Sequence, residues 1–292
     1  MSNCISYALF DIGKQDGCFE INSYVRGFMF NIRLARLLYP DWKVILHIDG
    51  ATKQKFPILD DLFRDKIIHI IGCEPAPLTK AMLWRMKPVF ERSRDGFPIY
   101  EHVICRDLDS PLTYKERLCV QQWIDNGKAA HAITDSVSHD MPMMGGMIGF
   151  LPKNFTEYTG IEDFDNLCKG GYSFENKGAD QILLSEKIYP CFSRKGHDSI
   201  TQHYLQGYGQ TWLSDWHNTV PEIDLKPYGI PDEMREAWAN PHQGLGGHIG
   251  CAGHYSPATE NFLRKYREQF KDIFMHETKY PDLFYWVKTG EI

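Results

Sequence analysis

The sequence predicts an α/β protein in which helices cover both faces of a mostly parallel sheet. Short apolar runs typical of strands alternate with stretches of helical periodicity along the first half of the chain. Of the 292 residues, 43% are hydrophobic and 13% aromatic, which is enough for a substantial core. This length fits one large α/β domain, or a core with a C-terminal subdomain.

Buried strands are expected where apolar residues follow one another without a polar face. These runs lie at residues 4–10, 43–48, 67–71, 102–105, 129–133 and 147–151. Helices are expected where apolar residues recur at a spacing near 3.6. These stretches lie at residues 21–38, 53–64, 80–92, 111–125 and 179–188. Tyr39-Pro40 and Tyr189-Pro190 should stop two of the helices, and Pro88 should kink or shorten another.

The last part of the chain has a different composition. Residues 201–255 are rich in Gly, His, Trp and Pro and show weak periodicity, and a helical pattern resumes at 258–274. We therefore interpret residues 1–200 as the core. Residues 201–292 would form a lid or acceptor-side extension packed on it, within a single structural domain.

Charge and cysteine content exclude several classes of protein. A net charge of -6 excludes a globally basic nucleic-acid binder, although a local basic patch remains compatible with it. No apolar run reaches the roughly 18 residues of a membrane span, and the first residues do not resemble a secretory signal. The 8 cysteines form no Cys-x-x-Cys pair, which favours a reducing cytoplasm, that of the host if the protein is viral.

Two acidic residues after a predicted strand carry the main chemical argument. Asp107 and Asp109 follow the apolar run 102–105, and at this spacing both carboxylates point the same way if strand geometry persists. The carboxyl edge of a parallel sheet is where ligands bind. The pair could there hold Mg²⁺ or Mn²⁺, which stabilises a leaving diphosphate as a Lewis acid. The alternative is a solvated acidic turn that caps the next helix.

Several motifs together resemble the GT-A-fold glycosyltransferases, in particular a group of mostly uncharacterised bacterial and viral members. They occur in the order of that family over roughly residues 1–200. The matching segments are 39–43, Leu83-Trp84-Arg85, Arg106-Asp107-Leu108-Asp109-Ser110, 115–123, 131–139, Met144-Gly145-Gly146-Met147, Gly178-Ala179-Asp180-Gln181, Ile188-Tyr189-Pro190 and His197-Asp198. The resemblance implies a Rossmann-like, mixed and mostly parallel sheet flanked by helices, with a C-terminal extension.

The resemblance also implies a metal site. Asp107 and Asp109 match the position of the family that binds metal and the nucleotide ribose, and His197 is similar to a further metal ligand of retaining relatives. An imidazole with carboxylate and phosphate oxygens suits Mn²⁺, and Mg²⁺ remains open. The alternative for His197 is an exposed loop residue without a ligand.

Other matched residues are expected at the donor sugar. Gly145 and Gly146 resemble the small-residue turn beneath the sugar, or else a simple strand bulge. Asp180 and Gln181 resemble the pair beside the anomeric carbon, although Asp180 could instead cap a helix. Asp135 is a candidate sugar contact or general base, with a structural loop role as the alternative.

The nucleotide and its diphosphate are assigned to a third set of residues. By the resemblance, the end of the first strand should hold the base and ribose, and Asp49 closes the second strand. The basic stretch from Lys80 to Arg94 either attracts a polyanion or forms a solvated helix face. Within it Lys80 and Arg85 are chosen for the diphosphate, and Arg106 either adds a cation or pairs with an aspartate. The residues assigned to the base and ribose are Ala8, Leu9 and Phe10.

The predicted function is metal-dependent transfer of a sugar from a nucleoside-diphospho-sugar to a hydroxyl acceptor. If the resemblance to retaining enzymes holds, the leaving phosphate can accept the proton of the acceptor. If the enzyme inverts, Asp180 or Asp135 is the candidate base. The alternatives are a phage-type enzyme that glycosylates a hydroxymethylated DNA base, and a non-catalytic carbohydrate- or metal-binding protein on the same scaffold. A metal-dependent phosphotransferase or nuclease shares the acidic pair, but no Gly-x-x-x-x-Gly-Lys loop supports a phosphotransferase.

Overall fold

The structure is a computed structural model. It describes residues 2–11, 21–110, 112, 114–134, 141–169, 174, 178–193, 199–204 and 217–219. The chain divides into two compact units. The first comprises Met1–Cys18, Asp41–Asp107 and Cys119–Val220, and the second comprises Phe19–Pro40, Leu108–Leu118 and Pro221–Ile292. The proposed extension beyond β8 and its helix at 258–274 lie outside the described residues.

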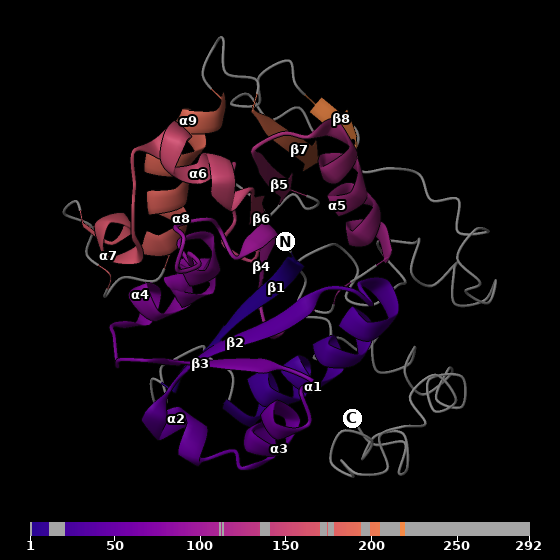
Figure 1. Ribbon diagram of the computed structural model, residues 1–292, viewed down its shortest axis with the longest axis vertical. Coiled ribbons are helices and arrows are strands. Elements are labelled where there is room, and N and C mark those ends of the chain that lie inside the picture. Colours follow the sequence, from indigo (N-terminus) through magenta and orange to yellow (C-terminus); the bar gives the residue numbers. More distant parts are fainter. Residues whose placement is uncertain are drawn as a thin grey trace. The chain divides into compact units, whose positions relative to one another are not determined.

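A mixed sheet forms the centre of the first unit (Figure 1). Within the described residues it has 8 strands in the order β3-β2-β1-β4-β6-β5-β7-β8. Strand β6 runs antiparallel to both β4 and β5, and the other neighbours are parallel. The strands are β1 (Ser2–Leu9), β2 (Lys43–Asp49), β3 (His69–Cys73), β4 (Tyr100–Arg106), β5 (Ala130–Thr134), β6 (Met147–Phe150), β7 (Ile200–Tyr204) and β8 (His217–Thr219).

This topology confirms the predicted fold class, a mostly parallel α/β sheet flanked by helices. Each strand that the apolar runs predict is present, and β3 is shifted by two residues along the chain. Strands β7 and β8 are additions to the prediction. Strand β7 has the sequence Ile-Thr-Gln-His-Tyr, and its polar members Thr201, Gln202 and His203 are buried, so it lacks an apolar signature.

The predicted helices are present, but some of them are divided into shorter helices. Pro57 separates α2 from α3, and the segment with Pro88 is a 3-10 helix, η1, because proline provides no backbone N–H donor. The helices are α1 (Ile21–Leu38), α2 (Gly50–Gln54), α3 (Ile58–Arg64), α4 (Leu78–Met82), η1 (Leu83–Val89), α5 (Tyr114–Asn126), α6 (Pro152–Thr159), α7 (Phe164–Leu167), α8 (Ala179–Leu183), η2 (Leu184–Ile188) and α9 (Tyr189–Ser193).

One predicted helix end is wrong. The helical segment that begins at Ala179 continues through Tyr189-Pro190 to Ser193, by way of the π-helical turn η2. In a π turn, backbone hydrogen bonds join residues five apart, whereas in an α-helix they join residues four apart. None of the helices in the described part of the chain is long and apolar enough to cross a membrane.

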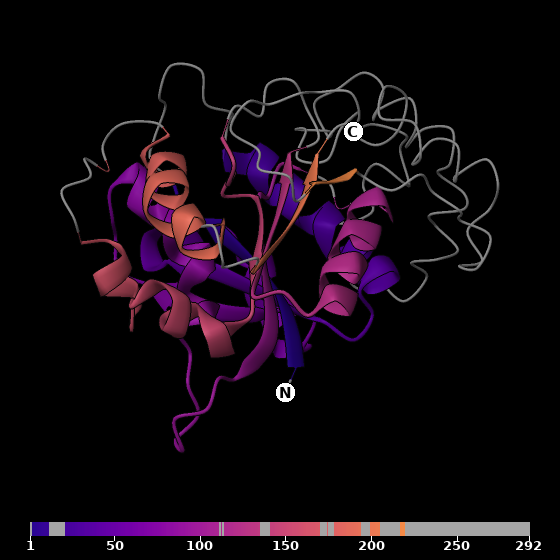
Figure 2. The ribbon, with the colours of Figure 1, turned by 90° about the horizontal axis from the view of Figure 1, so that it is seen from above.

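The main core of the first unit lies on one face of the sheet. Helices α6, α8 and α9 cover this face, and the end of α5 lies against the other (Figure 2). Phe155 of α6 and Phe192 of α9 pack on Phe150 of β6, with ring centroids 5.0 and 5.8 Å from that of Phe150. On the opposite face, Trp123 of α5 stacks on His131 of β5. Both faces are therefore covered, as the alternation of strands and helices predicts.

Candidate active site

The candidate site lies where β4 ends. Strand β4 extends to Arg106, and Asp107 is the first residue beyond it. Strand β6 runs in the opposite direction, and Met147 at its start pairs with Arg106. The turn that leads into β6 contains Gly145 and Gly146, so the antiparallel strand brings this turn to the same edge as Asp107. Gly145 and Gly146 therefore belong to a turn and do not form a strand bulge.

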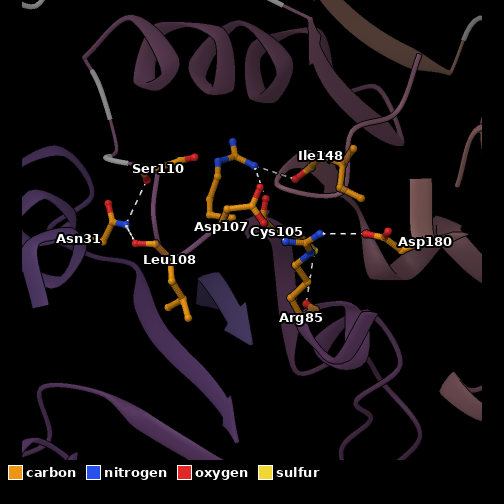
Figure 3. A network of polar contacts seen from close by, with 9 residues as sticks. Asn31, Arg85, Cys105, Asp107, Leu108, Ser110, Ile148 and Asp180 are labelled. Atoms are coloured by element: carbon orange, nitrogen blue, oxygen red, sulfur yellow. Dashed lines mark hydrogen bonds and ion pairs between the residues drawn. The ribbon is translucent and has the colours of Figure 1, made fainter. Parts of the chain in front are cut away.

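Arg85 of η1 joins two carboxylates at this edge (Figure 3). Its Nη1 donates to Oδ1 of Asp107, and its Nη2 lies 3.3 Å from Oδ2 of Asp180. The Arg85 side chain is 5% exposed and that of Asp180 1%, whereas Asp107 keeps 36% exposed. The Sγ of Cys105 donates to the backbone carbonyl of Arg85 at 3.3 Å, which ties η1 to β4. The Asp107 carboxylate is thus paired with Arg85, while part of the Asp107 side chain remains exposed.

Burial and charge act in opposite directions on these groups. Burial lowers the pKa of the Arg85 guanidinium, but Asp107 and Asp180 outweigh it and hold this pKa above its usual value. For Asp180, burial raises the pKa of the carboxyl, Arg85 opposes the rise, and the Asp107 carboxylate adds to it. The cation therefore makes it possible for two carboxylates to lie close together at the edge of the sheet.

The glycine turn fits closely against this ion-pair network. A Cβ placed on Gly146 would overlap the Asp107 carboxylate. A Cβ on Gly145 would overlap Arg85 and lie 3.1 Å from Oδ2 of Asp180. Any larger residue would have to displace a charged group, so glycine is required here by close approach.

Asp180 lies in the first turn of α8. The N-cap position of that helix belongs to Gly178, whose φ of 89° is left-handed, so Asp180 is not the cap. Its second oxygen, Oδ1, is buried and has no hydrogen-bond partner among the described residues. A buried acceptor without a partner is unfavourable unless a water or ligand satisfies it. Gln181 follows in the same turn and is half-buried.

Arg106 has a different environment from the one expected of a donor-binding cation. Its side chain is buried, and Nη1 donates to the carbonyl oxygens of Cys105 at 2.7 Å and Ile148 at 2.8 Å. The bond to Ile148 crosses from β4 to β6. These bonds support the register of the two strands at the site.

The ends of β1 and β2 carry the residues predicted for the nucleotide. Ala8 and Leu9 are buried, and the half-buried Phe10 packs edge-on against Trp84, with 6.0 Å between ring centroids. Asp49 caps α2: Oδ1 accepts from Thr52 N at 2.9 Å and Oδ2 from Thr52 Oγ1 at 2.6 Å. The structure therefore gives Asp49 a capping role, and nothing in it tests a contact with nucleotide.

The basic stretch is dispersed in the structure. Lys80 lies half-buried in α4, whereas Arg85 is enclosed by its two carboxylates. The Nζ atom of Lys87 lies 5.3 Å from the ring centroid of Phe164, and the guanidinium of Arg92 donates to backbone carbonyls. Because Arg85 is buried and Lys87 and Arg92 have local partners, the stretch does not form the solvated helix face that was the alternative.

The metal ligands predicted from the sequence are only partly described. Asp109 is half-buried in the turn after Asp107, while His197 and Asp135 lie outside the described residues. Among the residues that are described, no group of three or more His, Cys, Asp or Glu side chains could hold a metal ion. The predicted metal site therefore stays a prediction.

Sequence reasoning missed Asn31, a buried residue of α1 in the second unit. Its Nδ2 donates to the carbonyl oxygens of Leu108 at 3.1 Å and Ser110 at 3.0 Å. Its Oδ1 accepts from Leu112 N at 2.8 Å. A polar residue inside the apolar run Phe28–Ile32 was the available signal, because a buried amide requires partners.

No protein-family model matches the sequence, and no curated protein matches it. Among solved structures, it is similar to a candidate nucleotide-diphospho-sugar transferase from Desulfovibrio desulfuricans G20, with 15% identity and a TM-score of 0.45. That match covers 94% of this chain and 99% of the other. TarS 1–349 from S. aureus in complex with UDP has 12% identity and a TM-score of 0.43, with 99% and 87% covered.

A third solved structure is 4-diphosphocytidyl-2C-methyl-D-erythritol synthase from Anaerococcus prevotii DSM 20548. It has 11% identity and a TM-score of 0.41, and the match covers 69% of this chain and 86% of that protein. At these values none of the similarities bears on the chemistry of the site, which is argued from its own residues.

Proposed function

We propose that the protein transfers a sugar from a nucleoside-diphospho-sugar to a hydroxyl acceptor. One observation carries this proposal. Residues of the glycosyltransferase-like motifs, which come from separate segments of the chain, meet at the carboxyl edge of the sheet. Parallel α/β sheets bind their ligands at this edge. The residues that meet there are Arg85, Asp107, Gly145, Gly146 and Asp180.

The polar groups at this edge suit a hydroxyl-rich donor. Oδ1 of Asp180 is a buried acceptor that needs a partner, and a sugar hydroxyl is a donor of suitable chemistry. The absence of side chains at Gly145 and Gly146 lets Arg85 and Asp107 lie directly against the turn, which keeps these charged groups at the edge of the sheet. Arg85 holds the two carboxylates in place, so their arrangement does not need to form anew when a donor binds.

We further propose that donor binding depends on Mn²⁺ or Mg²⁺. The supporting observation is that Asp107 keeps 36% of its side chain exposed after pairing with Arg85, so its carboxylate can still accept a cation from solvent. Carboxylate oxygens are the ligands that these hard cations prefer. Asp107 would hold the ion, with Asp109 and His197 as the further ligands that the resemblance implies. A bound ion would supply charge stabilisation for the leaving diphosphate.

Retention of the anomeric configuration is the stereochemical outcome that we propose. Asp180 is almost fully buried and ion-paired with Arg85, so it is better suited to hold the donor than to remove a proton from an acceptor. Retention with proton transfer to the leaving phosphate requires no protein base at that point. Assignment of the product anomer by NMR tests this, and an inverted product would return Asp180 or Asp135 to the role of base.

A thermal-shift screen of nucleoside-diphospho-sugars, with and without Mn²⁺, tests the donor class. A ligand at 100 times its Kd stabilises the folded state by about 2.7 kcal/mol, so a true donor raises the Tm clearly. Asp107→Asn should abolish the shift, and Asp60→Asn should retain it because Asp60 only pairs with Lys53 on the surface. A screen in which no sugar nucleotide shifts the Tm would contradict the proposal.

Turnover separates the proposed enzyme from its alternatives. Release of free nucleoside diphosphate from the donor that gives the shift would exclude a non-catalytic binding protein. Transfer to hydroxymethylated duplex DNA, compared with glycans and small hydroxyl acceptors, would identify a DNA-modifying enzyme. Binding without release under all acceptor conditions would instead support the binding-protein alternative.

A further inference from the structure

A buried amide holds the loop that carries Asp109. Asn31 of α1 is 1% exposed and contacts three backbone groups of the segment Leu108–Leu112, all within the second unit. Figure 3 shows its Nδ2 directed at the carbonyl oxygens of Leu108 and Ser110.

The positions of these carbonyls are informative. Leu108 immediately precedes Asp109 and Ser110 immediately follows it, so Asn31 holds the backbone on both sides of the acidic residue. Its Oδ1 accepts from Leu112 N, which holds the next part of the loop. The amide therefore uses both of its N–H donors and its acceptor on one short segment.

Few other side chains could make this set of contacts. An aspartate at position 31 would place a carboxylate against two carbonyl oxygens, and a leucine would leave all three backbone groups without this partner. Buried backbone groups without partners are costly, so the loop would rearrange to find others. The side chain of Asp109 would then move with its backbone.

We propose that Asn31 is a positioning residue that sets the affinity of Asp109 for a divalent cation. This inference rests on the metal dependence proposed above. Groups that orient metal ligands typically contribute 10–100-fold to metal affinity. Asn31 acts through the backbone of the loop and has no role in contacting the donor or the reacting atoms.

Mn²⁺ binding without any donor tests this inference, with free Mn²⁺ measured by its EPR signal. We expect Asn31→Ala to weaken Mn²⁺ binding roughly 10–100-fold while circular dichroism remains that of the folded protein. Leu34→Ala is the matched control, because Leu34 is fully buried on the same helix and, as an apolar side chain, makes no hydrogen bond to the loop. If both variants bind Mn²⁺ as the wild type does, Asn31 is not a positioning residue.

A purely structural role makes a different prediction for activity. If Asn31 only stabilised the fold, Asn31→Ala and Leu34→Ala would lower activity alike. A positioning role predicts that excess Mn²⁺ restores the kcat of Asn31→Ala, with only the half-saturating Mn²⁺ concentration raised. Should the alanine variant not fold, Asn31→Ser retains one hydrogen bond and provides the same comparison.

The outcomes also separate this inference from the proposed function. If the wild type binds Mn²⁺ and Asn31→Ala binds it equally well, the inference is overturned and the transferase proposal is unaffected. A wild type that binds no Mn²⁺ overturns the inference as well. In that case a donor-dependent Tm shift without metal would still support a transferase, and its absence would contradict both.

Discussion

Two polar clusters in the first unit differ in whether their side chains stay charged when they are buried. The charged cluster, Arg85 with Asp107 and Asp180, retains its charges because each one faces an opposite charge. The imidazole cluster, His131 and His203 beside Trp123, loses its charge. Burial, followed by His203 and Arg106, lowers the pKa of His131 well below its usual value, and burial lowers that of His203 to about 4.

The contacts of the imidazole cluster are mainly between rings. His131 stacks on Trp123 with 5.3 Å between centroids, and His203 lies 5.7 Å from His131. Neither ring nitrogen of His131 has a hydrogen-bond partner among the described residues. Burial of polar groups alone therefore does not indicate a functional site. A partly exposed carboxylate, that of Asp107, is present only in the charged cluster of the two and distinguishes the candidate site.

The largest expected effect comes from removing the cation of the charged cluster. Arg85→Met leaves Asp107 and Asp180 close together without a counter-charge, and breaking a buried pair in this way costs about 3–5 kcal/mol. Urea unfolding should show this loss, and donor binding should disappear with it.

A compensating variant tests the cause of that loss. Arg85→Met combined with Asp107→Asn and Asp180→Asn removes the uncompensated charges and should recover much of the stability without recovering donor binding. If the triple variant is as unstable as Arg85→Met, the loss comes from packing around the guanidinium and the electrostatic argument is wrong.

Acid should destabilise the protein in part through the imidazole cluster. The folded-state pKa of His203 is about 4 against a usual 6.5, so the unfolded chain binds protons first as the pH falls. Its contribution to stability is therefore complete above pH 6.5 and is lost between about 6.5 and 4. The loss is roughly 1.4 kcal/mol for each pH unit within that window.

Measurements of unfolding free energy against pH, for the wild type and His203→Phe, check this sign. The phenylalanine variant should lose less stability on acidification, because it lacks the His203 imidazole, whose pKa differs between the folded and the unfolded state. Equal slopes for the two proteins would contradict the assignment of a depressed pKa to His203.

The glycine turn should give a smaller change in stability but a clear change in binding. Gly146→Ala forces the Asp107 carboxylate to move, which we expect to cost about 1–3 kcal/mol and to weaken donor binding at least tenfold. Gly72→Ala is the matched control because a Cβ there meets nothing within 4 Å. Equal donor binding by both variants would show that the close approach at Gly146 has no functional role.

The sequence predicted most where a local pattern reflects a local cause. The apolar run before Asp107 identifies β4, and the 3.6 periodicity identifies α1 because each depends on neighbouring residues alone. Strand β7 was missed because its buried residues are polar, and the helix through Pro190 was missed because a π turn alters the bonding pattern. These features depend on partners elsewhere in the fold.

The same distinction applies to the candidate site. The resemblance supplied Arg85, Asp107 and Asp180, but no local pattern indicates that one guanidinium would join both carboxylates. For Arg106 the sequence left open a cation for the donor or a pair with an aspartate, and it did not indicate the bonds to backbone carbonyls. That arrangement depends on the antiparallel pairing of β6 with β4. Contacts between segments distant in the sequence were therefore the part that could not be predicted.

A still weaker effect is expected from loss of the hydrogen bond between Gln122 and His203 in the imidazole cluster. Oε1 of Gln122 lies 2.7 Å from Nε2 of His203, and because an amide oxygen only accepts, the ring carries its proton on Nε2. Gln122→Leu should cost about 0.5–1.5 kcal/mol in urea unfolding, the usual contribution of one such bond. Donor binding should remain unchanged, because Gln122 has no part in the charged cluster. If the substitution instead weakened donor binding as strongly as Gly146→Ala, the two clusters would be coupled, and the separation between a structural and a functional cluster would have to be abandoned.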